Sequence, residues 1–185
     1  MRALQAYVFE YLREHACVDC GEGDPVVLEF DHIGEKSAGI AALVAAGVKL
    51  DVVENEISRC EVVCVSCHRR RTARRGHWRR AYTSEVSKRP YASAAVARNV
   101  AHLTRVLSRS TCVDCGERDP LVLEFDHVAP KREKVTRLAW FGCSLETIDA
   151  EIKRCEIRCA NCHRRITARR GEHFRYRALS SSVPP

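Results

Sequence analysis

The sequence predicts an α+β protein built from two small, metal-stabilised units in tandem. The stretch from Cys17 to Gly76 recurs as Cys112 to Gly171, displaced by 95 residues and with 33 identities in 60 aligned positions. Self-similarity at a fixed offset indicates a duplicated folding unit. Within each copy, short apolar runs typical of strands alternate with stretches of helical spacing, and two Cys-x-x-Cys pairs flank them.

A helix is predicted before each copy. Apolar residues recur at helical spacing over residues 3–15 and again over residues 92–109. We therefore predict a first module at 1–76, a polar and basic linker at 77–91, a second module at 92–177 and a disordered tail at 178–185.

Inside the first copy, the predicted order is strand, variable segment, helix, short extended piece and basic helix. The strand covers 26–30 and ends at an Asp-His pair, and the helix contains Leu50, Val53 and Ile57 on one face. The extended piece covers 61–63, and the basic helix runs over 68–76 and ends at a glycine. The same elements are expected 95 residues later, where Ser144 can cap the helix over 145–154.

Composition favours an intracellular protein whose small units need a metal ion or a disulfide for stability. Each unit is small, and only 6% of the 185 residues are aromatic, so the core of each is modest and a metal or disulfide is expected to support it. The N-terminal segment has no signal-like apolar region, and the longest apolar run, 40–48, is too short to span a bilayer. We therefore predict a cytoplasmic or intracellular location, no membrane association and reduced cysteines.

Eight of the eleven cysteines form two four-thiol sets with the same spacing. Two-residue spacers allow both thiolates of a pair to reach one ion, and four sulfurs complete a tetrahedral zinc shell without an open position. We therefore predict two structural Zn²⁺ ions per chain. The predicted ligands are Cys17, Cys20, Cys64 and Cys67 in the first copy, and Cys112, Cys115, Cys159 and Cys162 in the second.

A second type of metal site is predicted from an Asp-His pair and a later histidine in each copy. A carboxylate with an imidazole suits a harder divalent ion with open coordination positions. The later histidine is placed in the first turn of a basic helix, whose N-terminal end favours an anion such as phosphate. The residues are Asp31, His32 and His68, and Asp126, His127 and His163.

The formal charge of +7 is concentrated in arginines that follow each CxxCH sequence. Guanidinium groups match phosphate geometry, and a basic stripe indicates nucleic-acid binding. We predict contacts with the phosphate backbone of duplex DNA from Arg69, Arg70, Arg71, Arg74, Arg75, Arg164, Arg165, Arg169 and Arg170.

The order CxxC, strand ending in Asp-His, CxxCH and basic helix resembles the HNH endonucleases with a ββα-metal fold and a structural zinc. The resemblance covers about 60 residues of each copy. It implies DNA cleavage with Mg²⁺ or another divalent ion. By resemblance, Asp31 with His68 and Asp126 with His163 would hold that ion, and His32 and His127 would act as general bases.

One departure concerns the asparagine that in this family usually precedes CxxCH by five residues and steadies the loop that positions the base. Arg59 and Arg154 stand there, so the middle role is unassigned. Asn161 lies between two cysteines, where the first copy has Ser66. Both copies retain the Asp-His and CxxCH residues, so we expect two active sites, of which the second is the stronger candidate.

Two other functions fit parts of the pattern. The chain could be a zinc-stabilised nucleic-acid-binding protein without catalysis, although a pure binder has no need for an acid–base histidine beside a ligand pair. A zinc module that docks a protein is weaker, because it predicts an exposed apolar patch rather than arginines. The target sequence, nicking or double-strand cutting, the physiological metal and the oligomeric state are not determined by the sequence.

Overall fold

The computed structural model of the protein describes residues 3–35, 37–76, 93–171 and 173–180, and these form two compact units. Unit 1 consists of Met1–His68 with Arg164–Pro185, and unit 2 of Arg69–His163. Each unit thus combines most of one repeat with residues that follow the CxxCH sequence of the other, a grouping that the repeat boundaries do not suggest. The predicted linker lies outside the described residues. Of the predicted tail, 178–180 belong to a helix and 181–185 lie outside the description.

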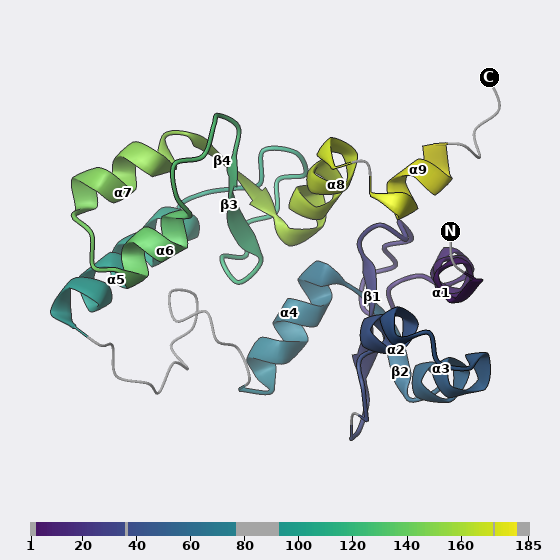
Figure 1. The fold of residues 1–185 in the computed structure, drawn as a ribbon. Coiled ribbons are helices and arrows are strands. Elements are labelled where there is room, and N and C mark those ends of the chain that lie inside the picture. Colours follow the sequence, from purple (N-terminus) through teal and green to yellow (C-terminus); the bar gives the residue numbers. More distant parts are fainter. Residues whose placement is uncertain (1–2, 36, 77–92, 172, 181–185) are drawn as a thin grey trace. The chain divides into compact units, whose positions relative to one another are not determined.

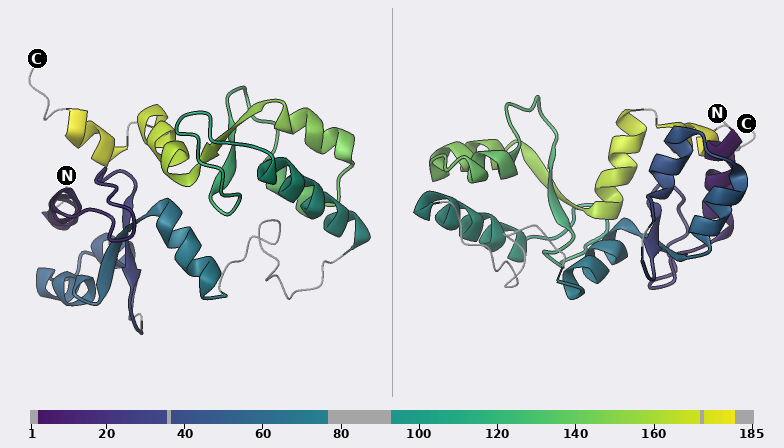
Figure 2. Two further views of the ribbon diagram at one scale, coloured as in Figure 1. Left: turned by 180° about the vertical axis from the view of Figure 1, so that it is seen from behind. Right: turned by 60° about the horizontal axis from the view of Figure 1, so that its bottom comes forward.

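Unit 1 has a two-stranded antiparallel hairpin with helices packed around it (Figure 1). The strands pair in a register that runs from Leu28 opposite Cys64 to His32 opposite Cys60. In Figure 2 these elements are drawn mainly in purple and blue. The elements of unit 1 are α1 (Ala3–Glu14), β1 (Leu28–His32), α2 (Ile40–Ala46), α3 (Leu50–Ile57), β2 (Cys60–Cys64), the start of α4 (Val65–Arg74), the end of α8 (Ala160–Arg170) and α9 (Phe174–Ser180).

Unit 2 repeats this arrangement, with its hairpin in the register Leu123 opposite Cys159 to His127 opposite Cys155. Ser93 and Ser144 cap the first and last complete helices by accepting hydrogen bonds from backbone N–H groups three residues on. Its elements are the end of α4, α5 (Ala94–Ser108), β3 (Leu123–His127), α6 (Val135–Trp140), α7 (Leu145–Ile152), β4 (Cys155–Cys159) and the start of α8.

The predicted α+β class, with two repeated hairpin–helix modules, is confirmed. The strands begin two residues later than predicted and include the Asp-His pair, because Leu28 to His32 all pair with β2. Helix α4 begins at Val65, so that His68 lies within it rather than at its first residue. Helices α2 and α6 form in the variable segments, for which the sequence predicted no element.

Each unit has its own apolar core. In unit 1 the core includes Leu12 of α1, Leu28 of β1 and Val53 of α3, all fully buried. The core of unit 2 includes the fully buried Leu103, Leu123 and Ile148. Burial of such a side chain stabilises a fold by about 1.5–3 kcal/mol. Among the described residues no helix is both long and apolar enough to cross a membrane.

Successive side chains of β1 point to opposite faces of the strand. Leu28 and Phe30 pack on the core, and His32 continues their face, whereas Glu29 and Asp31 lie on the other. The same alternation holds in β3. Glu29 and Asp31 therefore both reach the start of α4, where His68 lies.

Candidate functional site

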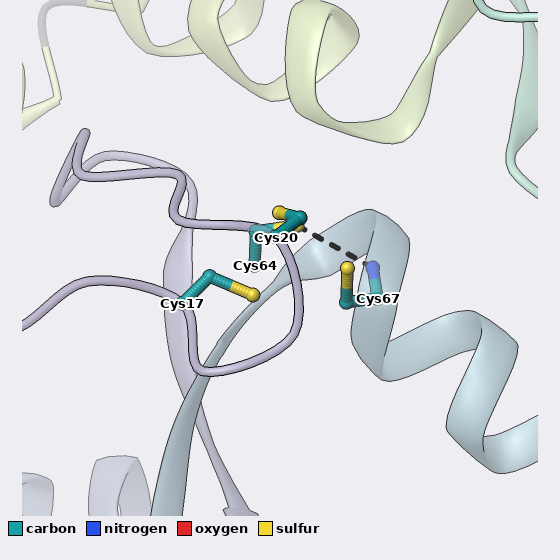
Figure 3. A group of neighbouring side chains, drawn as sticks. All are labelled: Cys17, Cys20, Cys64 and Cys67. Carbon is teal, nitrogen blue, oxygen red and sulfur yellow. Dashed lines mark hydrogen bonds between the residues drawn. The ribbon is translucent and has the colours of Figure 1, made fainter.

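Four cysteine sulfurs converge in each repeat, as the spacing predicted. In the first repeat, Cys17 and Cys20 come from the loop before β1, Cys64 from the end of β2 and Cys67 from the start of α4 (Figure 3). Gly21, with φ 76°, closes the loop, and its N–H donates to Cys17 O at 2.8 Å. The four sulfurs lie within 4.8 Å of one another, and so do their equivalents in the second repeat.

The sulfur geometry fits a tetrahedral ion. With Zn–S bonds of about 2.3 Å, tetrahedral sulfurs are about 3.8 Å apart. The structure places Cys20 Sγ 3.8 Å from Cys64 Sγ, and Cys115 Sγ 3.7 Å from Cys159 Sγ. All eleven cysteines are free, so none of these sulfurs is used in a disulfide. Each cluster could therefore hold one zinc ion.

The thiols of a cluster differ in how readily they ionise. Burial raises the pKa of Cys20 and of Cys159 to about 11. Burial also opposes ionisation of Cys112, but backbone hydrogen bonds, first that at Cys159, outweigh it and lower the pKa of Cys112 to about 7. Four neighbouring thiolates repel one another, so a bound cation is what would keep all of them ionised.

The structure brings the predicted divalent-ion ligands of unit 1 together. Asp31 Oδ1 lies 3.4 Å from His68 Nε2, and Asp31 is only 3% exposed. Two neighbouring ligand atoms of an octahedral ion at about 2.1 Å would be about 3.0 Å apart, so the two side chains would approach by about 0.4 Å on binding. His68 reaches this place because the chain leaves β2 at Cys64 and enters α4 directly. The two side chains are therefore close enough to be ligands of one ion.

Glu29, which the sequence reasoning missed, orients His68. Its Oε1 lies 2.6 Å from His68 Nδ1 on the same face of β1 as Asp31. Burial raises the pKa of Glu29, but the His68 hydrogen bond and the Arg164 guanidinium outweigh it and lower that pKa below its usual value. With Nδ1–H donating to Glu29, the Nε2 lone pair faces Asp31, as in carboxylate–histidine–metal triads.

Unit 2 has the same pair with one addition. Asp126 Oδ1 lies 3.5 Å from His163 Nε2, and His163 Nδ1 lies 2.7 Å from Glu124 Oε2. The second carboxylate oxygen of Asp126, however, accepts a hydrogen bond from Arg158 Nη1 at 2.7 Å. The first repeat has Val63 at this position. The two repeats therefore carry different charges around equivalent Asp-His pairs.

The predicted base His32 is held by a buried carboxylate. His32 Nε2 lies 2.7 Å from Glu56 Oε1, and the two side chains are 11% and 5% exposed. The same oxygen accepts hydrogen bonds from the N–H groups of Ser37 and Ala38, both at 3.2 Å. Glu56 thus joins the base to the loop that follows it, and it leaves Nδ1 as the nitrogen that can accept a proton.

The second repeat has the equivalent carboxylate. Glu151 Oε1 lies 2.9 Å from His127 Nε2 and accepts a hydrogen bond from Arg132 N at 3.1 Å. Sequence reasoning overlooked both glutamates, although a signal was present. Glu56 and Glu151 are identical in the two repeats, and each is a buried carboxylate among the apolar residues of its helix.

Arg59 and Arg154, the residues at the place of the family's asparagine, contact the same loops. Arg59 Nη1 donates to Ser37 Oγ at 3.3 Å, and Arg154 donates to the carbonyl of Pro130. Their carbonyls accept hydrogen bonds from Ile33 and Val128, the residues directly after the two Asp-His pairs, both at 3.0 Å. In each repeat, an arginine and a glutamate therefore both contact the loop that follows the Asp-His pair.

At least four of the nine arginines predicted to bind DNA form ion pairs with described residues of their own unit. In unit 2, Arg69 pairs with Glu124 at 2.8 Å, and Arg70 with Glu117 and Asp119 at 2.6 and 2.7 Å. In unit 1, Arg164 pairs with Glu29 at 2.9 Å, and Arg165 with Glu22 and Asp24. Exposed positions are held by Arg74, Arg75, Arg169 and Arg170.

A cavity of about 790 Å³ lies within unit 1 next to the base. Its lining includes Glu29, Phe30 and His32 of β1, and also Arg164 and Arg175. Arg175 Nη1 donates to the carbonyls of Pro25 and Leu28, both at 3.0 Å. Burial, and then the nearby Arg164 charge, lower the pKa of Arg175. Two close guanidinium groups on a cavity wall would favour an anion there.

No family model, no curated protein and no solved structure matches this chain.

Proposed function

We propose that the chain is a metal-dependent DNA endonuclease. The observation that carries this proposal is the arrangement on β1, where Asp31 faces His68 at 3.4 Å and the next residue, His32, is bonded to a buried glutamate at 2.7 Å. A divalent ion on Asp31 and His68 would polarise the scissile phosphate and stabilise the leaving oxygen. The two four-cysteine clusters would hold structural zinc and fix the start of α4 and of α8, each against its own hairpin.

The base chemistry follows from the hydrogen bonds of His32. Because Nε2 is bonded to Glu56, the Nδ1 nitrogen is the one that takes the proton from the attacking water. The imidazolium that results is stabilised by the Glu56 carboxylate, which also fixes the tautomer and the ring orientation. Ser37 and Ala38 keep this carboxylate in place through their N–H groups.

The charges around the site support a phosphodiester substrate. Arg164 and Arg175 line the cavity that His32 also lines, and because Arg164 is paired with Glu29 at 2.9 Å, Arg175 would supply the charge for a phosphate oxygen there. The exposed arginines near the ends of α4 and α8 would add contacts to the DNA backbone without reading bases. The preference for DNA over RNA comes from the HNH resemblance.

The test is cleavage of supercoiled plasmid by the zinc-loaded chain, first in EDTA and then with added Mg²⁺ or Mn²⁺. We expect cleavage only with the added ion, and His32→Ala with His127→Ala should slow it by roughly 100- to 10,000-fold while zinc content and DNA affinity persist. If the double variant cleaves as fast as the wild type, or if no ion supports cleavage, the alternative of a zinc-stabilised nucleic-acid-binding protein without catalysis takes its place.

A further inference from the structure

Arg158 distinguishes the two Asp-His sites. It stands on β4 opposite Glu124, where β2 has Val63 opposite Glu29. Val63 is fully buried and uncharged, whereas Arg158 is 8% exposed and brings a guanidinium group next to the proposed ligand carboxylate. The sequences around these positions are otherwise similar, since Cys60, Glu61 and Cys64 recur in the second repeat.

The guanidinium group of Arg158 is fixed by three carboxylates. Its Nη1 donates to Asp126 Oδ2 at 2.7 Å, its Nε donates to Asp114 Oδ2 at 2.8 Å, and its Nη2 pairs with Glu156. Asp114 lies between Cys112 and Cys115, so that the arginine is also anchored on the cysteine loop. An arginine held at several points in this way does not leave its place readily, because each charged hydrogen bond would have to be given up.

We propose that the chain binds a single catalytic divalent ion, at Asp31 and His68 of unit 1, and that Arg158 supplies the positive charge at the equivalent place in unit 2. This inference rests on the proposed function and deepens it. The Arg158 nitrogen bonded to Asp126 lies within about 7 Å of any ion bound by this carboxylate, because the nitrogen is 2.7 Å from one carboxylate oxygen and a metal–oxygen bond is about 2.1 Å long. At an effective dielectric constant of about 20, a unit charge at that distance weakens binding of a dication by well over 100-fold.

The inference reverses the expectation drawn from Asn161, which favoured the second repeat. It also gives unit 2 a structural role, in which Arg158 ties the cysteine loop to the hairpin. One chain then contains one complete hydrolytic site and cuts one DNA strand.

The experiment is Mn²⁺ binding to the zinc-loaded full-length chain, measured by electron paramagnetic resonance with zinc content checked by elemental analysis. We expect one Mn²⁺ per chain in the wild type, none after Asp31→Asn and one after Asp126→Asn. Arg158→Val should add a second Mn²⁺, and adding His163→Ala to that variant should remove it. Val63→Arg should abolish binding in unit 1, whereas Val63→Leu should leave it intact.

Two equivalent Mn²⁺ ions in the wild type, or none, would overturn the inference. If Arg158→Val does not fold, the Asp31→Asn and Asp126→Asn pair decides alone, because loss of Mn²⁺ from the second variant rather than the first contradicts the assignment. Plasmid cleavage is scored separately. One Mn²⁺ bound at Asp31 without any cleavage would refute the endonuclease proposal and leave the asymmetry between the units in place.

Discussion

Replacing Glu56 by glutamine tests the role of the buried carboxylate behind the proposed base. The glutamine has the same shape, so its carbonyl oxygen can still accept the hydrogen bonds from Ser37, Ala38 and His32 Nε2. What disappears is the negative charge that lies 2.7 Å from the imidazole when it takes a proton. General bases contribute roughly 100- to 10,000-fold to a rate. Because the variant keeps the base and loses only its charged partner, we expect plasmid cleavage to slow by roughly 10- to 100-fold.

The assay is single-turnover plasmid cleavage at saturating Mg²⁺, with zinc content and Mn²⁺ binding measured in parallel. In Glu56→Gln cleavage should slow while both metal measurements keep their wild-type values, because only the hydrogen-bond partner of the proposed base has changed. A loss of structure would lower the zinc content as well. Glu151→Gln is the matched control and should change cleavage much less if unit 1 is the hydrolytic unit. A Glu56→Gln variant that cleaves at the wild-type rate would refute this assignment of the base.

Three further outcomes are expected. Cys64→Ser should lose about one zinc per chain, measured by elemental analysis, and its first hairpin should unfold, measured by circular dichroism, because structural zinc contributes on the order of 10–16 kcal/mol of folding free energy. Full retention of zinc would contradict this prediction. Arg74→Ala with Arg75→Ala should reduce the log–log salt slope of DNA binding by roughly 0.9 per lost contact, whereas Arg70→Ala, which breaks internal ion pairs, should lower thermal stability; an unchanged slope removes α4 from the interface. Burial raises the pKa of Glu151, but hydrogen bonds, first from Arg132 N–H, outweigh it and lower that pKa. Ionised Glu151 therefore stabilises the fold above about pH 4.3, and this stabilisation is lost as the pH falls through the folded-state pKa. Glu151→Gln should make the free energy of unfolding, measured by denaturation, depend less on pH in this acidic range.

The sequence by itself determined the features that depend on local spacing and on duplication. The two Cys-x-x-Cys pairs of each repeat predicted the four-sulfur clusters, because two-residue spacers constrain where the thiols can go. The Asp-His pair and the histidine of CxxCH, which recur together in both copies, likewise predicted that Asp31 and His68 belong to one site. These statements needed only the spacing within each motif and its repetition at an offset of 95 residues.

The tertiary structure alone decided which charges face one another across long stretches of chain. The pairs His32–Glu56 and Asp126–Arg158 join residues 24 and 32 positions apart, and the pair Arg165–Asp24 joins residues 141 positions apart. No local periodicity specifies such contacts, because they depend on how helices pack on the hairpin and on which residues share a compact unit. An arginine in the sequence therefore predicts a phosphate contact and an internal ion pair equally well. Burial and a facing carboxylate are what separate Arg158 and Arg165 from the exposed Arg74 and Arg169.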